Sequence, residues 1–305
     1  DYVIAAKGWG ANVNITLKPY TDERVATEDF KAGQCDAALI TGLRARQFNQ
    51  FVGSIDSVGS IPSYTHMRDV VDLLANPKLA PNMISGPYEI AGAVPIGAGY
   101  FFVNDRSINT LAKAAGKKIA VFDWDKSQAE MVKMVGAQPV SADITTFGGK
   151  FNNNQVDIIV APIFAYKPME LYKGLGTKGG IARFPVIQIT FQLVLKKDKF
   201  PAGFGQKSRE YIANQVPRFF GLIRNTEREV DPKFWMHVPL ADRGGYDKIM
   251  RELRIHLTKA GFYDKRMMTL LGVQEIQIES VSFGEEKPKN QGHDESAWAE
   301  NRRVD

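Results

Sequence analysis

The sequence predicts an α/β protein of two similar lobes that enclose a cleft. Residues 30–42 and residues 151–162 repeat one step, in which the end of a helix is followed by a Gly or Asn, an Asp and a short apolar strand. Helix-like and strand-like segments alternate along the 305 residues, a length that suits two domains. Two copies of one α/β step therefore predict two related lobes, and a cleft between lobes is where a ligand usually binds.

The two copies of this step carry the same local chemistry. Gly33 in the first copy, and Asn153 or Asn154 in the second, suit the left-handed conformation that ends a helix. Asp36 and Asp157 stand at the start of the strand that follows, where a carboxylate can accept backbone N–H groups. Each copy thus predicts a defined turn from a helix into a buried strand.

The remaining elements follow from apolar periodicity and from the residues that start and stop it. The end of a helix is expected at residues 2–8, and Thr21 or Asp22 caps a second helix that ends at Gly33. Further helices are expected at residues 67–74, 108–115, 127–135, 211–224 and 246–260. Strands are expected at residues 14–17, 35–40, 90–103, 118–122, 157–161 and 181–195. The polar residues 42–59 predict a loop.

Composition excludes several classes of protein. The net charge is +5, but acidic and basic residues are interspersed, and no dense basic stretch with aromatic residues predicts nucleic-acid binding. Apolar runs stay short of the roughly 20 residues that a membrane span needs, so the chain is not expected to span a membrane. Cys35 is the single cysteine, which allows neither an internal disulfide nor a cysteine metal cluster. Its neighbours Gln34 and Asp36 add no positive charge that would activate the thiol.

Motifs for catalysis and for cofactor binding are missing. The four histidines are scattered and lack the i, i+4 spacing of a helix-borne zinc site. A formal G-x-G-x-x-G occurs at residues 174–179, but a helix precedes it and a strand follows, which is the wrong order for a dinucleotide site. The sequence therefore predicts a protein without enzymatic activity, cofactor or metal.

Candidate ligand-binding residues stand in loops at the carboxyl ends of the expected strands, where open α/β sheets place ligands. Aromatic side chains from these loops would line a cleft, with one Arg and one Asp as polar anchors. For any single aromatic residue, a place in the core is the alternative. The six candidates are Arg44, Tyr100, Asp123, Trp124, Phe164 and Tyr166.

From about Tyr20 to Asn225 the sequence resembles the extracytoplasmic solute receptors of tripartite (TRAP-type) transporters. The resemblance is carried by residues 28–36, 107–121, 136–139 and 155–157. Residues 42–49 are similar to a divergent, AdeT-like branch of solute-binding proteins. The resemblance implies a periplasmic protein that captures a small-molecule solute for the subunits of a membrane transporter, without chemistry.

The same resemblance implies a two-lobed periplasmic binding protein fold, type II-like, that closes by hinge motion. Lobe I is expected to contain residues 1–95 and about 190–225, and lobe II residues 96–189. Residues 226–283 are expected to form a helical region that packs on both lobes. A polar tail is expected at residues 284–305.

Three positions depart from the pattern of these receptors. Many members hold a substrate carboxylate with an Arg at the position of Ala120, and carry a second Arg at Tyr100 and an Asn at Ala161. Loss of a bidentate guanidinium removes a geometry-specific anion clamp. The departures therefore predict a bulkier or more apolar solute than a simple organic acid.

Two further expectations follow. Relatives carry an upstream strand with its own cysteine, which implies that Cys35 is half of a disulfide. AdeT-like proteins have also been linked to efflux and to aminoglycoside resistance, so an envelope interaction protein of that kind is the alternative function.

Overall fold

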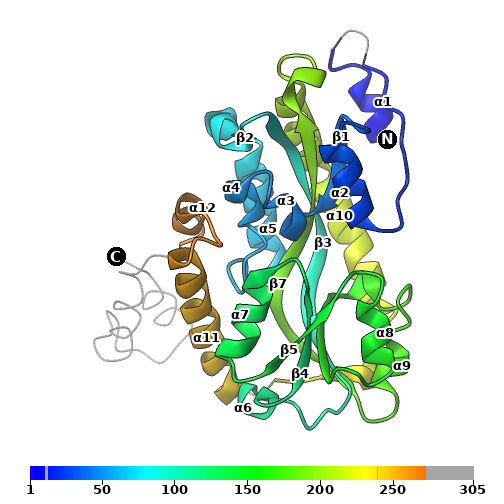
Figure 1. Ribbon diagram of the computed structural model, residues 1–305, viewed down its shortest axis with the longest axis vertical. Helices are drawn as coiled ribbons and strands as arrows, with labels where there is room; N and C mark the ends of the chain where they lie inside the picture. Colours follow the sequence, from blue (N-terminus) through cyan, green and yellow to red (C-terminus); the bar gives the residue numbers. More distant parts are fainter. Residues whose placement is uncertain (11–12, 239, 273–305) are drawn as a thin grey trace.

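The computed structural model describes residues 1–10, 13–238 and 240–272, and it confirms the α/β class (Figure 1). One eight-stranded sheet runs through the molecule in the order β1-β7-β3-β6-β4-β5, with β2 beside β3 and β8 beside β7. The strands are β1 (Ala37–Thr41), β2 (Ile84–Ser85), β3 (Tyr88–Val103), β4 (Lys118–Phe122), β5 (Gln138–Ala142), β6 (Ile158–Pro162), β7 (Gly180–Lys196) and β8 (Trp235–Met236).

Helices cover both faces of this sheet. The α-helices are α1 (Tyr2–Ala6), α2 (Glu23–Lys31), α3 (Gly42–Ala45), α4 (Gln50–Gly53), α5 (Tyr64–Leu74), α6 (Leu111–Ala114), α7 (Lys126–Met134), α8 (Phe147–Asn152), α9 (Tyr172–Leu175), α10 (Phe204–Arg228), α11 (Leu240–Lys259) and α12 (Lys265–Leu270). Short 3-10 helices are η1 (Pro77–Met83), η2 (Ile163–Ala165), η3 (Lys197–Lys199) and η4 (Pro232–Phe234).

Two long antiparallel strands, β3 and β7, join the two halves of the molecule. At one end β1 pairs with β7, and we call this half, with α2 to α5, lobe I. At the other end β6 pairs with β3, with β4 and β5 beyond it, and this half, with α6 to α9, is lobe II. The β3–β7 register shifts at four places between Ile90 and Phe102, and Gly97 among them has a φ of 113°. Such irregularities bend a strand pair, so β3 and β7 bend where they pass between the lobes.

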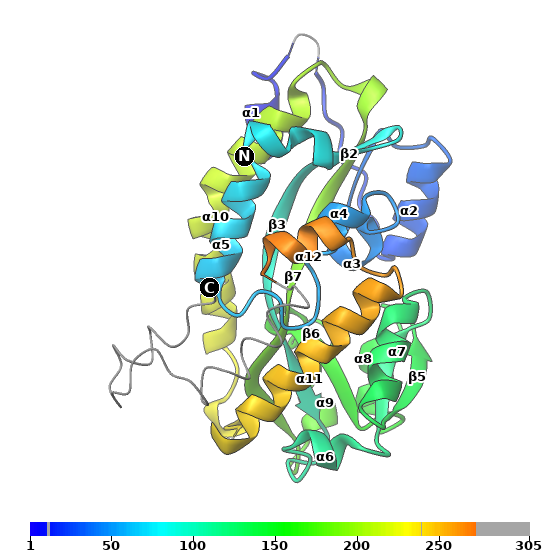
Figure 2. The same ribbon diagram turned by 90° about the vertical axis from the view of Figure 1, so that its left-hand side faces the viewer.

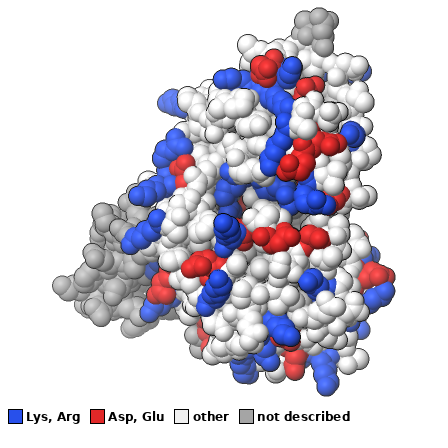
Figure 3. Space-filling view, viewed as in Figure 1, with Lys and Arg blue, Asp and Glu red and all other residues white. Residues whose placement is uncertain are grey.

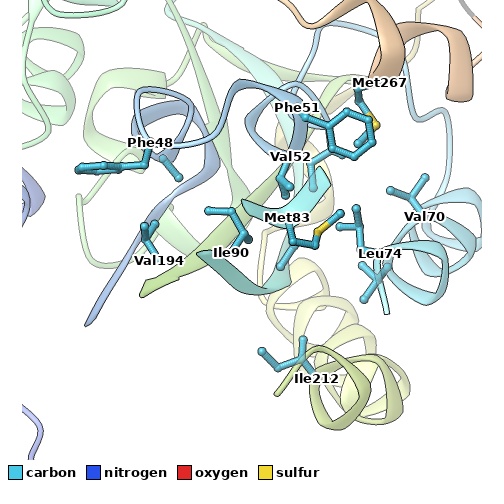
Figure 4. Close-up of a cluster of buried hydrophobic side chains, with 14 of the residues drawn as sticks. Phe48, Phe51, Val52, Val70, Leu74, Met83, Ile90, Val194, Ile212 and Met267 are labelled. Carbon is cyan, nitrogen blue, oxygen red and sulfur yellow. The ribbon is translucent and has the colours of Figure 1, made fainter. Parts of the chain in front are cut away.

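Each lobe has its own apolar core. In lobe I, residues from α4, α5, α10 and α12 meet strands β3 and β7, as Figure 4 shows for Phe51, Leu74, Ile90 and Ile212. In lobe II a second cluster forms around Phe102, packed by α8 and α9. Two separate cores on one shared pair of strands agree with a two-lobed fold.

Two long helices contact both lobes. The 25-residue helix α10 packs on α5 of lobe I and on η2 of lobe II. Helix α11 lies against α7 of lobe II, and α12, which follows it, lies against α4 of lobe I (Figure 2). The C-terminal helices therefore tie the lobes together along one side, while the exact domain boundaries stay a prediction.

Local signals in the sequence are confirmed where they involve capping residues. The Asp22 side chain accepts from the Arg24 N–H and caps α2, and Gly33 has a φ of 85°. In the second copy of the step Asn154 has a φ of 54°, and the Asp157 carboxylate accepts from the Lys118 N–H at 2.8 Å.

Two sequence predictions about lobe I are wrong. Residues 42–59 are not simply a polar loop, because residues 42–45 form α3, residues 50–53 form α4, and most of the segment is buried. Asn49, for example, accepts from the Val52 N–H and donates to the Asn82 carbonyl. Residues 14–17 are extended but form no strand, since no described strand pairs with them. The polar tail expected at residues 284–305 falls outside the described residues.

Candidate functional site

The carboxyl ends of the lobe II strands face lobe I across a hollow. Phe122 ends β4, Pro162 ends β6, and Phe164 follows in η2. Opposite them lie Thr41, which ends β1, and Leu43 of α3. All five residues line one continuous hollow. This interlobe cleft is where the fold gathers the loops of both lobes, as the sequence predicts.

The hollow is larger than the cleft. Its volume is about 1810 Å³, whereas a small-molecule site usually occupies roughly 300–1,000 Å³. Beyond the cleft it continues along lobe I between residues 13–21 and β1, and it also reaches residues of α7 and α11. The part between the strand ends of the two lobes is the candidate ligand site. Charged side chains of both signs lie across the middle of the face seen in Figure 3, between the two halves of the molecule.

Arg44 follows Leu43 in α3 but does not itself border the hollow, and its charge is already paired. Its Nε donates to the Glu23 Oε1 at 3.1 Å, and both side chains are largely buried. The same carboxylate accepts from the Thr41 N–H and from the Thr41 hydroxyl. Glu23 thus holds the end of β1 and Arg44 together, and Arg44 is not a free anion clamp.

Trp124 meets Arg44 from the opposite lobe. The Arg44 guanidinium carbon lies 4.2 Å from the centre of the Trp124 ring, and Phe122 stacks on Trp124 with its ring centre 5.5 Å away. A second contact between the lobes lies nearby, where Arg46 Nη1 donates to the Ser127 hydroxyl at 3.4 Å. Cation–π and hydrogen-bond contacts therefore join the two walls at one side of the cleft.

Phe164 is the predicted residue with the most open position in the cleft. Its side chain is 42% exposed, and its ring centre lies 6.4 Å from that of Phe191 on β7. Asp123 is exposed in the loop after β4, where its N–H donates to the Ala142 carbonyl. Of the six predicted residues, Phe164 alone is among those that border the hollow, while Arg44, Asp123 and Trp124 lie in segments beside it.

Tyr100 and Tyr166 lie elsewhere. The Tyr100 hydroxyl donates to Glu227 of α10 at 3.1 Å, and burial, followed by the Glu227 carboxylate, raises the Tyr100 pKa. Tyr64 donates to the same oxygen of Glu227 at 2.5 Å. Tyr166 is only 7% exposed and packs in the lobe II core, where burial raises its pKa. Like Arg44, Asp123 and Trp124, neither tyrosine borders the hollow.

The three departures from the receptor pattern come together in space. Ala161 pairs directly with Tyr100 in the β3–β6 register, and Ala120 belongs to the same apolar cluster. Ala120 and Ala161 are buried, and both border the hollow. Where many receptors place polar ligand residues, this protein presents a small apolar surface.

Sequence reasoning missed several residues of the site. Glu23 is a helix N1 residue whose partners lie 18 and 21 positions away, and no local signal indicates them. Phe147 borders the cleft from α8, a helix for which the sequence shows no clear apolar periodicity. Asp56 does not border the hollow; it is fully buried beside Gly42 of α3, and it accepts from the N–H and the hydroxyl of Thr190.

The described residues show no metal-binding cluster of three or more His, Cys, Asp or Glu side chains. Among the helices that the structure describes, none is long and apolar enough to cross a membrane.

Solved structures of TRAP periplasmic solute-binding proteins share this fold. The protein from Desulfovibrio salexigens with bound orotic acid is similar with a TM-score of 0.72 and 16% identity, over 89% of this chain and 91% of that one. The protein from Sulfitobacter sp. with bound β-D-galacturonate has a TM-score of 0.72 and 13% identity, over 89% and 92% of the two chains. The two-lobed fold predicted from the sequence is thus confirmed.

A short segment has a different relative. Over 41 residues, 13% of this chain, the sequence is 51% identical to the peptidoglycan-associated lipoprotein of Pseudomonas aeruginosa, of which the match covers 24%.

Most of the sequence matches one family. The chain is 55% identical to the probable solute-binding protein AdeT1 of Acinetobacter baumannii over 271 residues, 89% of this chain and 88% of that protein. Residues 2–286 match the family model of solute-binding protein AdeT 1/2. The cleft between two lobes, the shared fold and these matches agree, and the chain belongs to the AdeT family of solute-binding proteins.

Proposed function

We propose that this protein is a periplasmic receptor that captures a small molecule in the interlobe cleft and delivers it to a TRAP-type membrane transporter, without catalysing a reaction. The family membership and the solute-bound structures of the same fold support ligand capture. The observation that carries the proposal is the cleft itself, whose walls come from the strand ends of both lobes.

The solute that suits this cleft is uncharged and largely apolar or aromatic. Phe122, Phe164 and Phe191 border the hollow, and aromatic rings offer a large apolar surface for a flat ligand. Arg44 has its guanidinium bonded to Glu23, so its charge is compensated. Ala120 and Ala161 supply no hydrogen bond from their side chains. A carboxylate buried here would lack the bidentate partner that offsets its desolvation.

A thermal-shift screen with a broad metabolite library tests this function, because a ligand that binds only the folded state raises the melting temperature. We expect hits among neutral aromatic or apolar compounds. Phe164→Ala should lose most of the rise in melting temperature that such a compound produces. Leu222→Ala, at a similarly exposed site on α10, should keep that rise. Equal shifts in both variants would argue against the proposed site.

A second candidate function is contact with the peptidoglycan layer, which the 41-residue similarity to a peptidoglycan-associated lipoprotein favours. It is compatible with solute capture, and it differs from the alternative that the sequence left open, which is an envelope interaction protein associated with efflux or aminoglycoside resistance. Sedimentation of the full chain with purified peptidoglycan tests it. Co-sedimentation that persists at about 0.15 M salt would support peptidoglycan contact, and a chain that stays in the supernatant would refute this function.

A further inference from the structure

Two tyrosines from different lobes donate to the same oxygen of Glu227. Tyr64 begins α5 in lobe I, and its hydroxyl donates to the Glu227 Oε1 at 2.5 Å. Tyr100 lies on the part of β3 that pairs with β6 in lobe II, and its hydroxyl donates to the same oxygen at 3.1 Å. Glu227 stands in the last turn of α10, the helix that contacts both lobes. We call these three side chains the hinge cluster.

The hinge cluster is attached to β3 where this strand bends. In the register of β3 and β7, Ile96 has no partner between the paired residues Pro95 and Gly97. An extra residue of this kind locally disrupts the ladder of backbone hydrogen bonds. Just beyond it, the Ala98 N–H donates to the Tyr64 hydroxyl at 3.4 Å. The Tyr64 hydroxyl therefore accepts from the strand at its bend and donates to α10 beside it.

Packing of the two rings holds both hydroxyls in place. The Tyr64 ring stacks on Phe220 of α10, with 5.2 Å between the ring centres. The Tyr100 ring meets the Trp235 ring of β8 edge-on, with 5.3 Å between the centres. Burial raises the pKa of both tyrosines, so both hydroxyls are protonated donors at neutral pH. Hydrogen bonds to an ionised carboxylate are among the stronger ones in proteins.

The bond from Tyr64 to Glu227 crosses from one lobe to the other. Val230 and Phe234, which follow the end of α10, belong to the apolar core of lobe II, and Tyr100 packs against the same core. The last turn of α10 is therefore anchored in lobe II, whereas Tyr64 packs against the core of lobe I. A rotation of the lobes about the bend in β3 would change the distance between Tyr64 and Glu227.

We propose that the hinge cluster sets the angle between the lobes, with Tyr64 and Tyr100 as positioning residues that act through Glu227. The proposal rests on solute capture by closure of the two lobes. Tyr100 fixes the carboxylate from lobe II, and Tyr64 binds it from lobe I. The shared acceptor favours the closed arrangement over a more open one, and it does so without a contact to the solute.

Pulsed electron paramagnetic resonance on the full chain without solute measures this angle. Spin labels on Lys78→Cys in η1 of lobe I and Lys133→Cys in α7 of lobe II, both exposed positions, report the distance between the lobes in a Cys35→Ser background. In Tyr64→Phe we expect the ratio of closed to open molecules to fall about tenfold, because a hydrogen bond to a charged group is lost. Tyr100→Phe should shift the ratio in the same direction.

A matched control is available within lobe II. The Tyr172 hydroxyl donates to Glu170 at 3.2 Å, so Tyr172→Phe also removes a bond from a tyrosine to a glutamate, but one that lies inside a single lobe. This variant should leave the distance distribution unchanged. Glu227→Gln keeps an oxygen that can accept from both tyrosines, so it should stay closer to the parent protein than Glu227→Leu.

Thermal unfolding checks that every variant folds. A distance distribution that stays unchanged in the double variant Tyr64→Phe, Tyr100→Phe would overturn the proposal, and so would an equal shift in Tyr172→Phe. The measurement uses no solute, so failure of the hinge cluster is distinguished from failure of solute capture, which the thermal-shift screen tests.

Discussion

The guanidinium of Arg44 in lobe I lies over the ring of Trp124 in lobe II, with 4.2 Å between the guanidinium carbon and the ring centre. In lobe I, Glu23 forms an ion pair with Arg44. In lobe II, the ring of Phe122 stacks on the ring of Trp124. This arrangement is a contact between the two lobes that does not depend on a bound solute.

The first prediction concerns this contact. Arg44→Gln and Trp124→Leu should each lower the free energy of unfolding, and a double-mutant cycle should show a coupling of about 1 kcal/mol. X-ray scattering of either variant without ligand should show a larger radius of gyration, because the cleft opens more readily. Arg24→Gln combined with Trp124→Leu is the control, since Arg24 is an exposed arginine that pairs with Asp22. A coupling as large in that control would refute the contact.

A second prediction concerns the charge of the cleft. Glu23→Gln removes the carboxylate that neutralises Arg44, while the amide oxygen can still accept a bond from Thr41. We expect the variant to bind aromatic carboxylic acids that the parent protein does not bind. Titration calorimetry with one acid on both proteins checks this. Failure of the folded variant to gain any affinity for acids would mean that Arg44 does not face the solute.

The third prediction concerns pH. Burial raises the pKa of Asp56 from 3.8 to about 7, although the two Thr190 donors and the charge of Arg46 act in the opposite direction. Between those values the folded protein keeps a proton on this carboxyl that the unfolded chain has lost, so stability falls as pH rises. From pH 5 to pH 8 this loss should amount to about 2 kcal/mol. Urea unfolding of the parent and of Asp56→Asn at both pH values isolates it, because the variant lacks this group. A difference between the two proteins that stays constant with pH would contradict the assignment.

A fourth prediction concerns the close approach of α3 and α4. A Cβ on Gly53 would lie 2.4 Å from the Cα of Arg46, which is a backbone clash. Gly53→Ala should therefore destabilise the protein by about 1–3 kcal/mol and weaken solute binding, because α3 carries Arg44. In Gly221→Ala the new Cβ meets no atom within 4 Å, and the change in helix α10 should be neutral or stabilising. Thermal unfolding of the pair measures the difference.

Local signals in the sequence predict many helices and strands of this fold, but they do not predict the contacts between residues that are distant in the sequence at the site. Asp22, Gly33 and Asn154 act within a few residues of their own positions, so their capping roles could be predicted. The contact between Arg44 and Trp124 depends on how two lobes meet, which no local pattern encodes.

Phe164 and Tyr166 illustrate the same limit within one loop. Both are aromatic residues that follow strand β6, and the sequence pattern predicts the same cleft position for both. The loop turns into a 3-10 helix at residues 163–165, in which successive side chains point about 120° apart. Phe164 therefore projects into the cleft, while Tyr166 turns into the core against Phe234.

We propose that the interlobe cleft holds an uncharged solute. The most direct measurement is titration calorimetry of the parent protein with an aromatic amide taken from the thermal-shift screen and with the corresponding carboxylic acid. We predict that the amide binds at least about tenfold more tightly than the acid, since the cleft offers a carboxylate no free bidentate cation. Tighter binding of the acid would contradict it.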